Sequence, residues 1–430
     1  MSRDAVQLRG AAAPNPGHQA VPVEGAEPKC APAGLAGGGL SPALVRLMAV
    51  AAGVAVASDY YAQPLLPELA HEIGVSVAQA GAIVTTAQLG YALGLLLIVP
   101  LGDLIEPRRL VVGVSLLTAL GLLLTALSPG LGGILVGTAL AGLCSVLAQI
   151  LIPVAATLAA PGKRGSVVGT IMSGLLLGVL LARTAAGALA GLGGWRTVYW
   201  AGALALVLLA VILVRRLPGQ RPAHRLSYPQ LLASVFVLLR EEGELRLRAA
   251  LGALSFASFS VLWTSLAFML AAPPFRFATG TIGLFGLAGA AGVVAASLAG
   301  RMSDRGQGKS ATRLGCLALL LSWWPLLAGA HSLSLLILGI LLLDMAVLMI
   351  HVSNQGAIYR IRPEARSRLT AAYMSCYFAG GALGSFVSAF AYSRGGWSGV
   401  ALAGAVFSVL CLLVWELARS AGLRQELEAS

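Results

Sequence analysis

Apolar residues of this chain gather in long runs that are separated by short polar stretches. From Pro42 onward, twelve such runs of about 20–27 residues follow one another, each long enough to cross a bilayer as a helix. The expected crossings are 43–65, 77–101, 108–127, 131–157, 165–190 and 197–216 in the first half, and 247–271, 280–300, 311–329, 333–357, 368–392 and 397–418 in the second. The pattern therefore predicts an all-α membrane protein with twelve transmembrane helices.

The two halves of the chain repeat one another. Moving the stretch 161–203 by 202 positions places it on 363–405 without a gap, so that Arg164 falls on Arg366 and the GGW at 193–195 on the GGW at 395–397. A period close to half the length indicates two copies of one large unit. We therefore expect two six-helix bundles, 42–217 and 247–418, related by a parallel internal repeat.

Three segments lie outside these bundles. Residues 1–41 are rich in Ala, Pro and Gly and lack an apolar run, which is typical of a disordered tail. In the linker 218–246, apolar and polar positions alternate from Tyr228 to Arg240, which favours a short helix on the membrane surface. Residues 419–430 form a second tail.

Ser76 and Gln79 have the spacing of a capping box at the start of the second crossing.

Composition and charge agree with a membrane protein and set its orientation. Only 11% of the 430 residues are charged and 58% are hydrophobic, whereas soluble domains carry about 25% charged residues. The net charge of +12 comes from arginines and lysines in alternate loops, and the opposite loops contain only Arg196, Arg276 and Arg394. By the positive-inside rule both tails are cytoplasmic, and the basic balance indicates topology rather than nucleic-acid binding.

Motifs of enzymes and metal sites are missing from the sequence. The five cysteines have no metal-binding spacing, and there is no P-loop, HExxH or nucleophile-elbow motif. We therefore expect neither an enzyme nor a cofactor nor a metal site. The expected partners are a small-molecule substrate, protons and the lipid bilayer, with the chain acting as a monomer.

Two loops carry related motifs about 201 positions apart. The second, Gly300 to Gly306 (GRMSDRG), closely resembles the G-x-x-x-D-R-x-G-R-like signature of the major facilitator superfamily, and the first, Leu101 to Arg109 (LGDLIEPRR), is a degenerate copy. More narrowly, Tyr60 to Pro67 (YYAQPLLP) and His351 to Gln355 (HVSNQ) resemble a bacterial branch of sugar and drug efflux permeases. The resemblance implies a secondary transporter of the bacterial inner membrane, and more specifically an exporter that works by alternating access.

The same resemblance implies a cytoplasmic latch, in which a carboxylate at one helix end faces the positive N-terminus of a neighbouring helix. It would consist of Asp103, Arg108 and Arg109 near the start of the eleventh helix, at 366–369, and of Asp304 and Arg305 near the start of the fifth, at 164–166. The alternative is that both loops are solvated turns whose charges only set the topology.

Charged residues inside a crossing are costly and are functional candidates. Asp344 lies near the middle of the tenth crossing, and His351 and Gln355 follow on the same helix face. Because a carboxylate and an imidazole can both exchange protons, we expect Asp344 and His351 to form a proton relay. The alternative is a buried Asp344 that only hydrogen-bonds neighbouring helices.

Asp59 and Arg183 lie at similar depths in the first and fifth crossings. Since the resemblance makes these helices neighbours and neither charge should be buried alone, we expect a buried ion pair. Its role could be structural, gating, or recognition of a charged group on the substrate.

Further polar and aromatic residues are candidates for the substrate cavity, and the tyrosines among them could instead be interfacial anchors. The candidates are Tyr60, Tyr61, Gln63, Gln88, Gln149, Trp263, Asn354 and Gln355. The fifth crossing departs from the G-x-x-x-G-P-x-x-G-G pattern of drug/proton antiporters, because Gly178 is followed by Val179 and Ala182 by Arg183. Antiport is therefore less well supported than transport.

Together these features predict export of a small organic or amphipathic compound, coupled to inward proton flow through Asp344. A proton-driven importer or a facilitator would have the same sequence features, and a receptor on the same scaffold would bind its ligand without flux.

Overall fold

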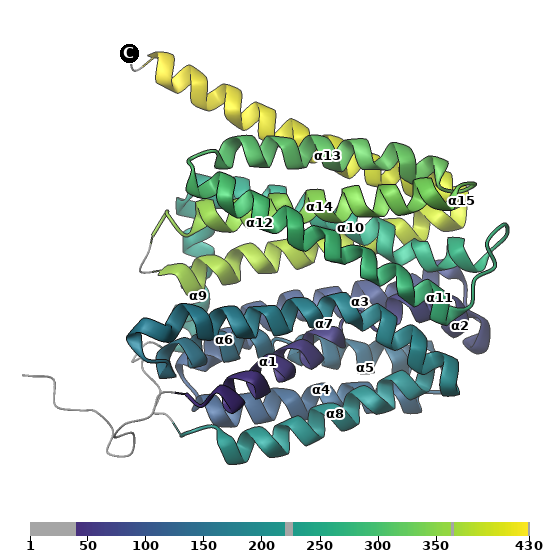
Figure 1. Ribbon diagram of the computed structural model, residues 1–430, viewed down its shortest axis with the longest axis horizontal. Coiled ribbons are helices and arrows are strands. Elements are labelled where there is room, and N and C mark those ends of the chain that lie inside the picture. Colours follow the sequence, from purple (N-terminus) through teal and green to yellow (C-terminus); the bar gives the residue numbers. More distant parts are fainter. Residues whose placement is uncertain (1–39, 220–226, 363–364, 429–430) are drawn as a thin grey trace, which may run out of the picture. The chain divides into compact units, whose positions relative to one another are not determined.

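The computed structural model describes residues 40–219, 227–362 and 365–428, and every regular element in those ranges is a helix (Figure 1). Residues 1–39 of the expected N-terminal tail, 220–226 of the linker, 363–364 and 429–430 lie outside the description. So do the side chains of Asp103, Pro161, Val293, Ser303, Asp304 and 422–428.

The first half consists of α1 (Pro42–Ala57), α2 (Ala62–Ile73), α3 (Val77–Leu97), η1 (Val99–Asp103), α4 (Pro107–Leu127), α5 (Leu131–Cys144), α6 (Leu147–Leu158), η2 (Pro161–Lys163), α7 (Arg164–Gly193) and α8 (Trp195–Arg216). In the first half, two crossings that the sequence pattern predicts as continuous are broken, the first between α1 and α2 and the fourth between α5 and α6. The breaks meet, because the hydroxyl oxygens of Ser58 and Ser145 lie 2.8 Å apart.

The second half follows the linker helix α9 (Tyr228–Glu241). It consists of α10 (Gly243–Ala271), α11 (Thr279–Leu284), η3 (Phe285–Gly289), α12 (Ala290–Asp304), α13 (Gly308–Ala328), α14 (Leu333–Ile358) and α15 (Arg366–Glu428). The eighth crossing, predicted as one helix over 280–300, is interrupted by a 3-10 segment at Phe285–Gly289. Helix α15 is bent at Gly396, whose φ of 55° is non-helical, so it contains two helices in sequence.

Eleven segments in the described ranges are long and apolar enough to cross a membrane. The last of them, Arg366–Ala421, holds both the eleventh and the twelfth expected crossings on either side of Gly396. Counted in this way, the described chain has the twelve crossings that the sequence pattern predicts. Leucines and tryptophans exposed on the outer faces of the helices, such as Leu192, Trp324 and Leu417, suit contact with lipid.

The internal repeat is visible in the packing of the two halves. Gly194 and Gly396 both have positive φ and each precedes the tryptophan that begins the last crossing of its half. Gly178 of α7 packs against the backbone of α1 at Gly53, where a Cβ would overlap Gly53. In the second half Gly380 of α15 packs in the same way against Ala253 of α10. Small residues let these helix backbones approach closely in each half.

Local signals in the sequence agree with the helix ends. Ser76 and Gln79 form the predicted capping box of α3, and the linker contains a helix, α9, where apolar and polar positions alternate. Ser227 and Gln230 form a second capping box at its start. The larger apolar core fills the first half and continues into α10 and α15 through Phe256, Tyr377 and Phe378. The two halves therefore share packed apolar surface.

Candidate functional site

Arg183 lies at the centre of the candidate site. It is ten residues from the outer end of α7, about 15 Å along the helix at 1.5 Å per residue, and its side chain is 4% exposed. The guanidinium Nε donates a hydrogen bond of 2.6 Å to Oε1 of Gln63, which stands in the first turn of α2. The guanidinium carbon of Arg183 lies 5.0 Å from the ring centre of Tyr60, which is in the break between α1 and α2. The break thus brings two polar candidates to Arg183.

Trp263 of α10 joins Arg183 to Asp344. The guanidinium carbon of Arg183 lies 3.9 Å from the centre of the Trp263 ring, which is the geometry of a cation–π interaction. On its other side the indole Nε1 donates a hydrogen bond of 3.2 Å to Oδ1 of Asp344. Arg183 and Asp344 also attract each other electrostatically. Because Arg183 belongs to the first half and Trp263 and Asp344 to the second, this cluster connects the two halves.

The expected ion pair between Asp59 and Arg183 is not formed. Neither carboxylate oxygen of Asp59 has a hydrogen-bond partner among the described residues, and no salt bridge within 4.0 Å joins it to Arg183. The break at residues 58–61 explains the difference. Asp59 lies in this turn and faces residues of α3, α4, α5 and α8, whereas Arg183 belongs to α7.

Asp59 instead lines a small cavity of about 10 Å³. Thr138 and Tyr199 line the same cavity, and their hydroxyl groups also have no partner among the described residues. The carboxylates of Asp59 and Asp344, both buried, therefore differ in their surroundings: Asp344 accepts from an indole and faces a cation, whereas Asp59 faces hydroxyl groups.

His351 and Asp344 lie on one face of α14 but do not contact each other directly. Nδ1 of His351 lies 3.0 Å from the hydroxyl oxygen of Tyr373. The ring centre of Tyr377 lies 4.8 Å from that of His351, and Tyr377 interacts electrostatically with Asp344. Two positions seven apart on a helix are about 10 Å apart along its axis, and Tyr377 is a group that interacts with both side chains.

Arg248, which the sequence analysis did not select, continues this polar chain toward the N-terminal end of α10. Its Nη1 donates to Oδ1 of Asn354 at 3.3 Å and to the hydroxyl of Thr312 at 3.1 Å, and its Nε donates to Glu244 at 2.7 Å. Nδ2 of Asn354 donates in return to the backbone carbonyl oxygen of Arg248 at 3.3 Å, and the Asn354 side chain also interacts with Tyr373. The sequence signal that could have identified Arg248 is its spacing from Glu244, because opposite charges four residues apart on one helix can pair.

The remaining cavity candidates lie apart from Arg183. Gln88 of α3 is fully buried against Gly381 of α15, and its amide has no partner among the described residues. Gln149 hydrogen-bonds the hydroxyl of Tyr91. Tyr61 packs edge-on against Tyr199 inside the first half, and Gln355 is half-buried on α14. The structure therefore gathers Tyr60, Gln63 and Trp263 around Arg183 and leaves the other five candidates elsewhere.

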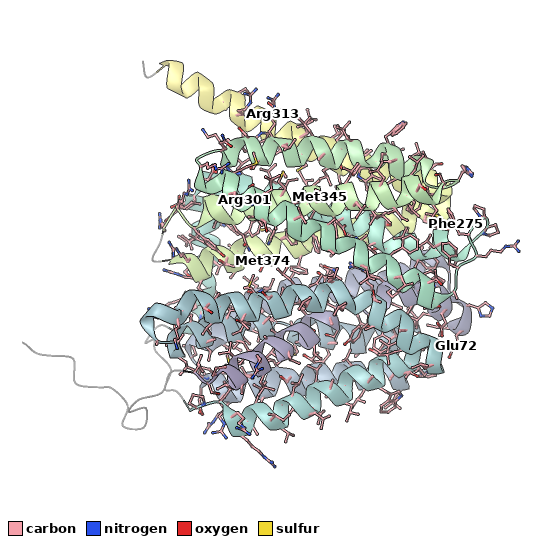
Figure 2. All side chains as sticks on the ribbon, in the orientation of Figure 1. Glu72, Phe275, Arg301, Arg313, Met345 and Met374 are labelled. Atoms are coloured by element: carbon pink, nitrogen blue, oxygen red, sulfur yellow. The ribbon has the colours of Figure 1, made fainter. Side chains whose placement is uncertain are left out.

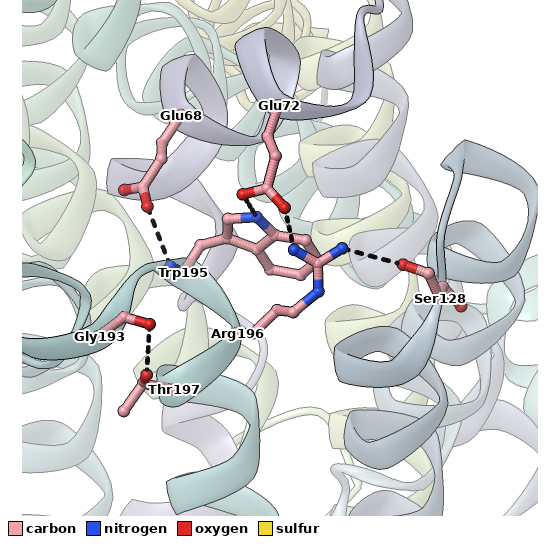
Figure 3. Close-up of polar contacts among 7 residues, drawn as sticks. All are labelled: Glu68, Glu72, Ser128, Gly193, Trp195, Arg196 and Thr197. Carbon is pink, nitrogen blue, oxygen red and sulfur yellow. Dashed lines mark hydrogen bonds and ion pairs between the residues drawn. The ribbon is translucent and has the colours of Figure 1, made fainter.

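A polar cluster at the outer ends of the helices was also missed (Figure 3). Glu68 of α2 accepts the backbone N–H of Trp195 at 3.0 Å. It also accepts the hydroxyl of Thr279 at 3.3 Å, so it connects the first half with α11 of the second. Glu72 accepts the Trp195 indole N–H at 2.7 Å and pairs with Arg196. The sequence analysis did not select Glu68 and Glu72, because two glutamates one helical turn apart form no motif that distinguishes them from ordinary surface charges.

The outer ends of α7 and α11 pack closely beside this cluster. A Cβ on Gly283 would lie 2.6 Å from the carbonyl oxygen of Arg183, and the hydroxyl of Thr184 donates to the carbonyl of Gly283 at 3.0 Å. Figure 2 shows Glu72 and Phe275 at this end of the helices and Arg301 toward the other. The halves are thus held together on the side that the positive-inside rule assigns to the outside.

The latch remains a prediction, because the side chains of Asp103 and Asp304 lie outside the description. Of its other members, Arg109 pairs with Glu106 at 3.0 Å. Arg305, like the start of α7 at 164–166 to which the second part of the latch was assigned, is exposed.

Comparison with known proteins decides the family. The model of the Major Facilitator Superfamily matches residues 48–326 and 248–428. The chain belongs to this superfamily. Its members are transporters rather than enzymes, so the protein is a multi-pass membrane protein that acts as a secondary transporter.

Relatives among bacterial proteins agree with this assignment. The chain is 58% identical over 376 residues to the uncharacterized transporter YgaY of Escherichia coli O157:H7, covering 87% of this chain and 95% of that one. It is 27% identical over 264 residues to the inner membrane transport protein YnfM of E. coli K12, covering 61% of this chain and 63% of that one.

Solved structures confirm the fold. A bacterial homologue of the lysosomal transporter Spinster, in an inward-facing and unoccupied conformation, matches with a TM-score of 0.72 at 14% identity, covering 90% of this chain and 99% of that one. A mutant form of the nucleoside transporter NupG matches with a TM-score of 0.69 at 15% identity, covering 87% and 99%. At these identities the likeness concerns the fold alone.

Proposed function

We propose that this superfamily member exports a small organic or amphipathic compound in a proton-coupled cycle, with Asp344 as the group that binds the proton. The contact of Trp263 with both Arg183 and Asp344 carries the proposal. Opposite charges buried at the junction of two mobile halves are costly to keep and are typical of transport sites. The cycle is alternating access, and the chain acts as a monomer because its two halves supply both sides of the pathway.

Proton binding at Asp344 changes the attraction between the halves. With Asp344 ionised, the charges of Arg183 and Asp344 compensate each other across the junction. A proton on Asp344 removes the negative partner and leaves Arg183 to be compensated by another group. The relative energies of the outward- and inward-open arrangements therefore depend on proton occupancy, which is what coupling requires.

The polar chain of the second half supports a path for this proton toward the cytoplasm. It runs from Tyr377 through His351, Tyr373 and Asn354 to Arg248. We retain His351 as the relay residue, now acting through Tyr377 rather than by contact with Asp344. The chain ends at Glu244, whose carboxylate is about half exposed.

Location and direction are part of the proposal. The relative YnfM is named an inner membrane transport protein, and we propose the same membrane for this chain, with both termini in the cytoplasm. The resemblance to efflux permeases favours export. The expected latch at 103–109 and 304–305 would close the cytoplasmic side when the site opens outward.

Energised inside-out vesicles test the function. Compounds from an amphipathic panel are added, and pH change and compound uptake are recorded for the native chain and for Asp344→Asn at matched expression. We expect at least one compound to be taken up with proton movement in the native chain alone. Asp59→Asn is the matched control, because it removes a buried carboxylate away from Arg183, and we expect it to keep the coupling.

Other outcomes separate the alternatives. Uptake without proton movement, equal in the native chain and Asp344→Asn, would identify a facilitator. Coupled transport found only in right-side-out vesicles would identify an importer, and binding without flux in either orientation a receptor. Each of these would overturn the proposed function.

A further inference from the structure

Two hydrogen-bond donors beside each other at the site have no partner in the described structure. They are Nη2 of Arg183 and Nε2 of Gln63. The side chains are 4% and 2% exposed, and the 2.6 Å bond from Nε of Arg183 to Oε1 of Gln63 holds them together. A buried donor without an acceptor costs free energy, and more so when it is charged.

Both unpartnered groups donate, and one carries a positive charge, so a negatively charged acceptor complements them best. A guanidinium keeps its charge at any physiological pH and is suited to carboxylates and phosphates. Asp344 attracts Arg183, but its Oδ1 already accepts from Trp263, and Nη2 of Arg183 has no hydrogen-bond partner among the described residues. Arg183 and Gln63 therefore keep free donors for a ligand.

The surroundings of the two donors are aromatic. Trp263 and Tyr60 are joined there by Phe259, whose ring centre lies 5.6 Å from the guanidinium carbon of Arg183. Such rings favour the apolar body of a ligand and contribute few hydrogen bonds of their own. The polar and apolar groups together match a molecule with one anionic end and an apolar remainder.

We infer that the transported compound is an organic acid in its anionic form, whose carboxylate is bound by Nη2 of Arg183 and Nε2 of Gln63. Its apolar part lies against Trp263, Phe259 and Tyr60. This rests on the proposed function and adds the chemical class of its substrate. The anion is held by the first half of the chain, while Trp263 and Phe259 of the second half cover it.

An anionic substrate agrees with export. The cytoplasmic side of a bacterial membrane is electrically negative, so an anion that leaves the cell moves with the membrane potential, at about 2.3 kcal/mol per charge for each 100 mV. A proton that returns inward on Asp344 moves with the same potential. The membrane potential then favours both the exit of the anion and the return of the proton.

Binding to the purified full-length chain in lipid nanodiscs tests the inference. The probes are benzoate, phenylacetate and cinnamate, each compared with its own neutral amide by isothermal titration calorimetry. We expect carboxylates to bind at least about tenfold more tightly than the amides, since a charge-assisted hydrogen bond to a buried partner contributes that much. Equal binding of acids and amides would overturn the inference.

Two variants locate the anion. Gln63→Glu has nearly the same shape, keeps an acceptor for Nε of Arg183, and replaces the free donor by a negative charge. We expect it to fold and to lose carboxylate binding, whereas Arg183→Gln loses it through the missing cation. Arg276→Gln removes an exposed outer arginine and serves as the control. Melting temperature and size-exclusion profile of each variant verify folding.

The readouts keep this inference separate from the proposed function. Proton-coupled uptake of neutral or cationic compounds, unchanged in Gln63→Glu, would refute the organic acid and leave the proton coupling standing. Carboxylate binding that needs Gln63 and Arg183, with no proton movement in vesicles, would support the anion site and refute the coupling.

Discussion

The guanidinium carbon of Arg183 lies 3.9 Å from the centre of the Trp263 ring, although the two residues belong to different halves of the chain. The same indole donates to Asp344 at 3.2 Å. One side chain thus contacts a cation through its face and an anion through its edge. Movement of either half against the other must change at least one of these contacts.

Trp263→Phe separates the two contacts. Phenylalanine keeps an aromatic face for Arg183 but lacks the N–H that Asp344 accepts. We expect coupled transport to fall about tenfold, because one hydrogen bond to a charged group is lost, while protein yield is kept. The matched control is Trp324→Phe, which changes an indole that is 72% exposed on the lipid-facing side. Equal effects of both changes would contradict the role of Trp263.

Glu68→Gln weakens the outer contact between the halves. Glu68 joins Trp195 of the first half to Thr279 of the second, whereas Glu72 bonds only residues of the first half. Ala288 belongs to η3, which packs beside Arg183 at Gly286 and beside Asp344 at Gly289. We expect Glu68→Gln to increase exposure of the outer side of the site, measured as the rate at which a membrane-impermeant maleimide labels a cysteine introduced at Ala288. Glu72→Gln should leave that rate unchanged, and a similar increase in both would show that neither is specific to closure.

Arg248→Gln removes a buried cation with three side-chain partners. Loss of one partner from a buried charged network costs about 3–5 kcal/mol, so we expect a large fall in melting temperature. Arg313→Gln breaks an exposed pair with Glu416, which contributes at most about 1 kcal/mol. Thermal unfolding in detergent measures both changes. A small change in melting temperature for Arg248→Gln would show that the hydrogen bonds of Arg248 do not stabilise the fold.

Gly178→Ala tests the close approach of α1 and α7. The added methyl overlaps the backbone of Gly53, and such overpacking typically costs about 1–3 kcal/mol. Gly191 of the same helix has open space around it, so Gly191→Ala should be neutral or stabilise the helix by about 1 kcal/mol. Opposite shifts of the melting temperature are therefore expected for one chemical change at two positions. Shifts of the same sign would show that the α1–α7 contact tolerates a methyl group.

Apolar periodicity and repetition were sufficient to predict much of this protein. The twelve crossings, their two sets of six, the capping box at Ser76 and the helix from Tyr228 all depend on residues that are close in sequence or on the 202-position offset. The superfamily followed from the motif at Gly300 to Gly306 and its copy. These signals are local or repetitive, and the surrounding lipid requires each apolar run to satisfy its own backbone hydrogen bonds as a helix.

Which polar residues meet depended on tertiary structure. At the break of the first crossing, Gln63 and Tyr60 contact Arg183, whereas Asp59 does not. Sequence spacing assigns a residue to a face of an ideal helix, but it does not predict where a helix stops and resumes, nor which side chain of the other half lies opposite. The sequence by itself determined the number, the order and the repeat of the crossings. The hydrogen bond of Arg183 with Gln63 was decided by the packing of α2 against α7 within the first half, and the contact of Arg183 with Trp263 beside Asp344 by the packing of the two halves. Sequence patterns do not predict these contacts because they join residues far apart in the chain, 120 positions in the case of Gln63.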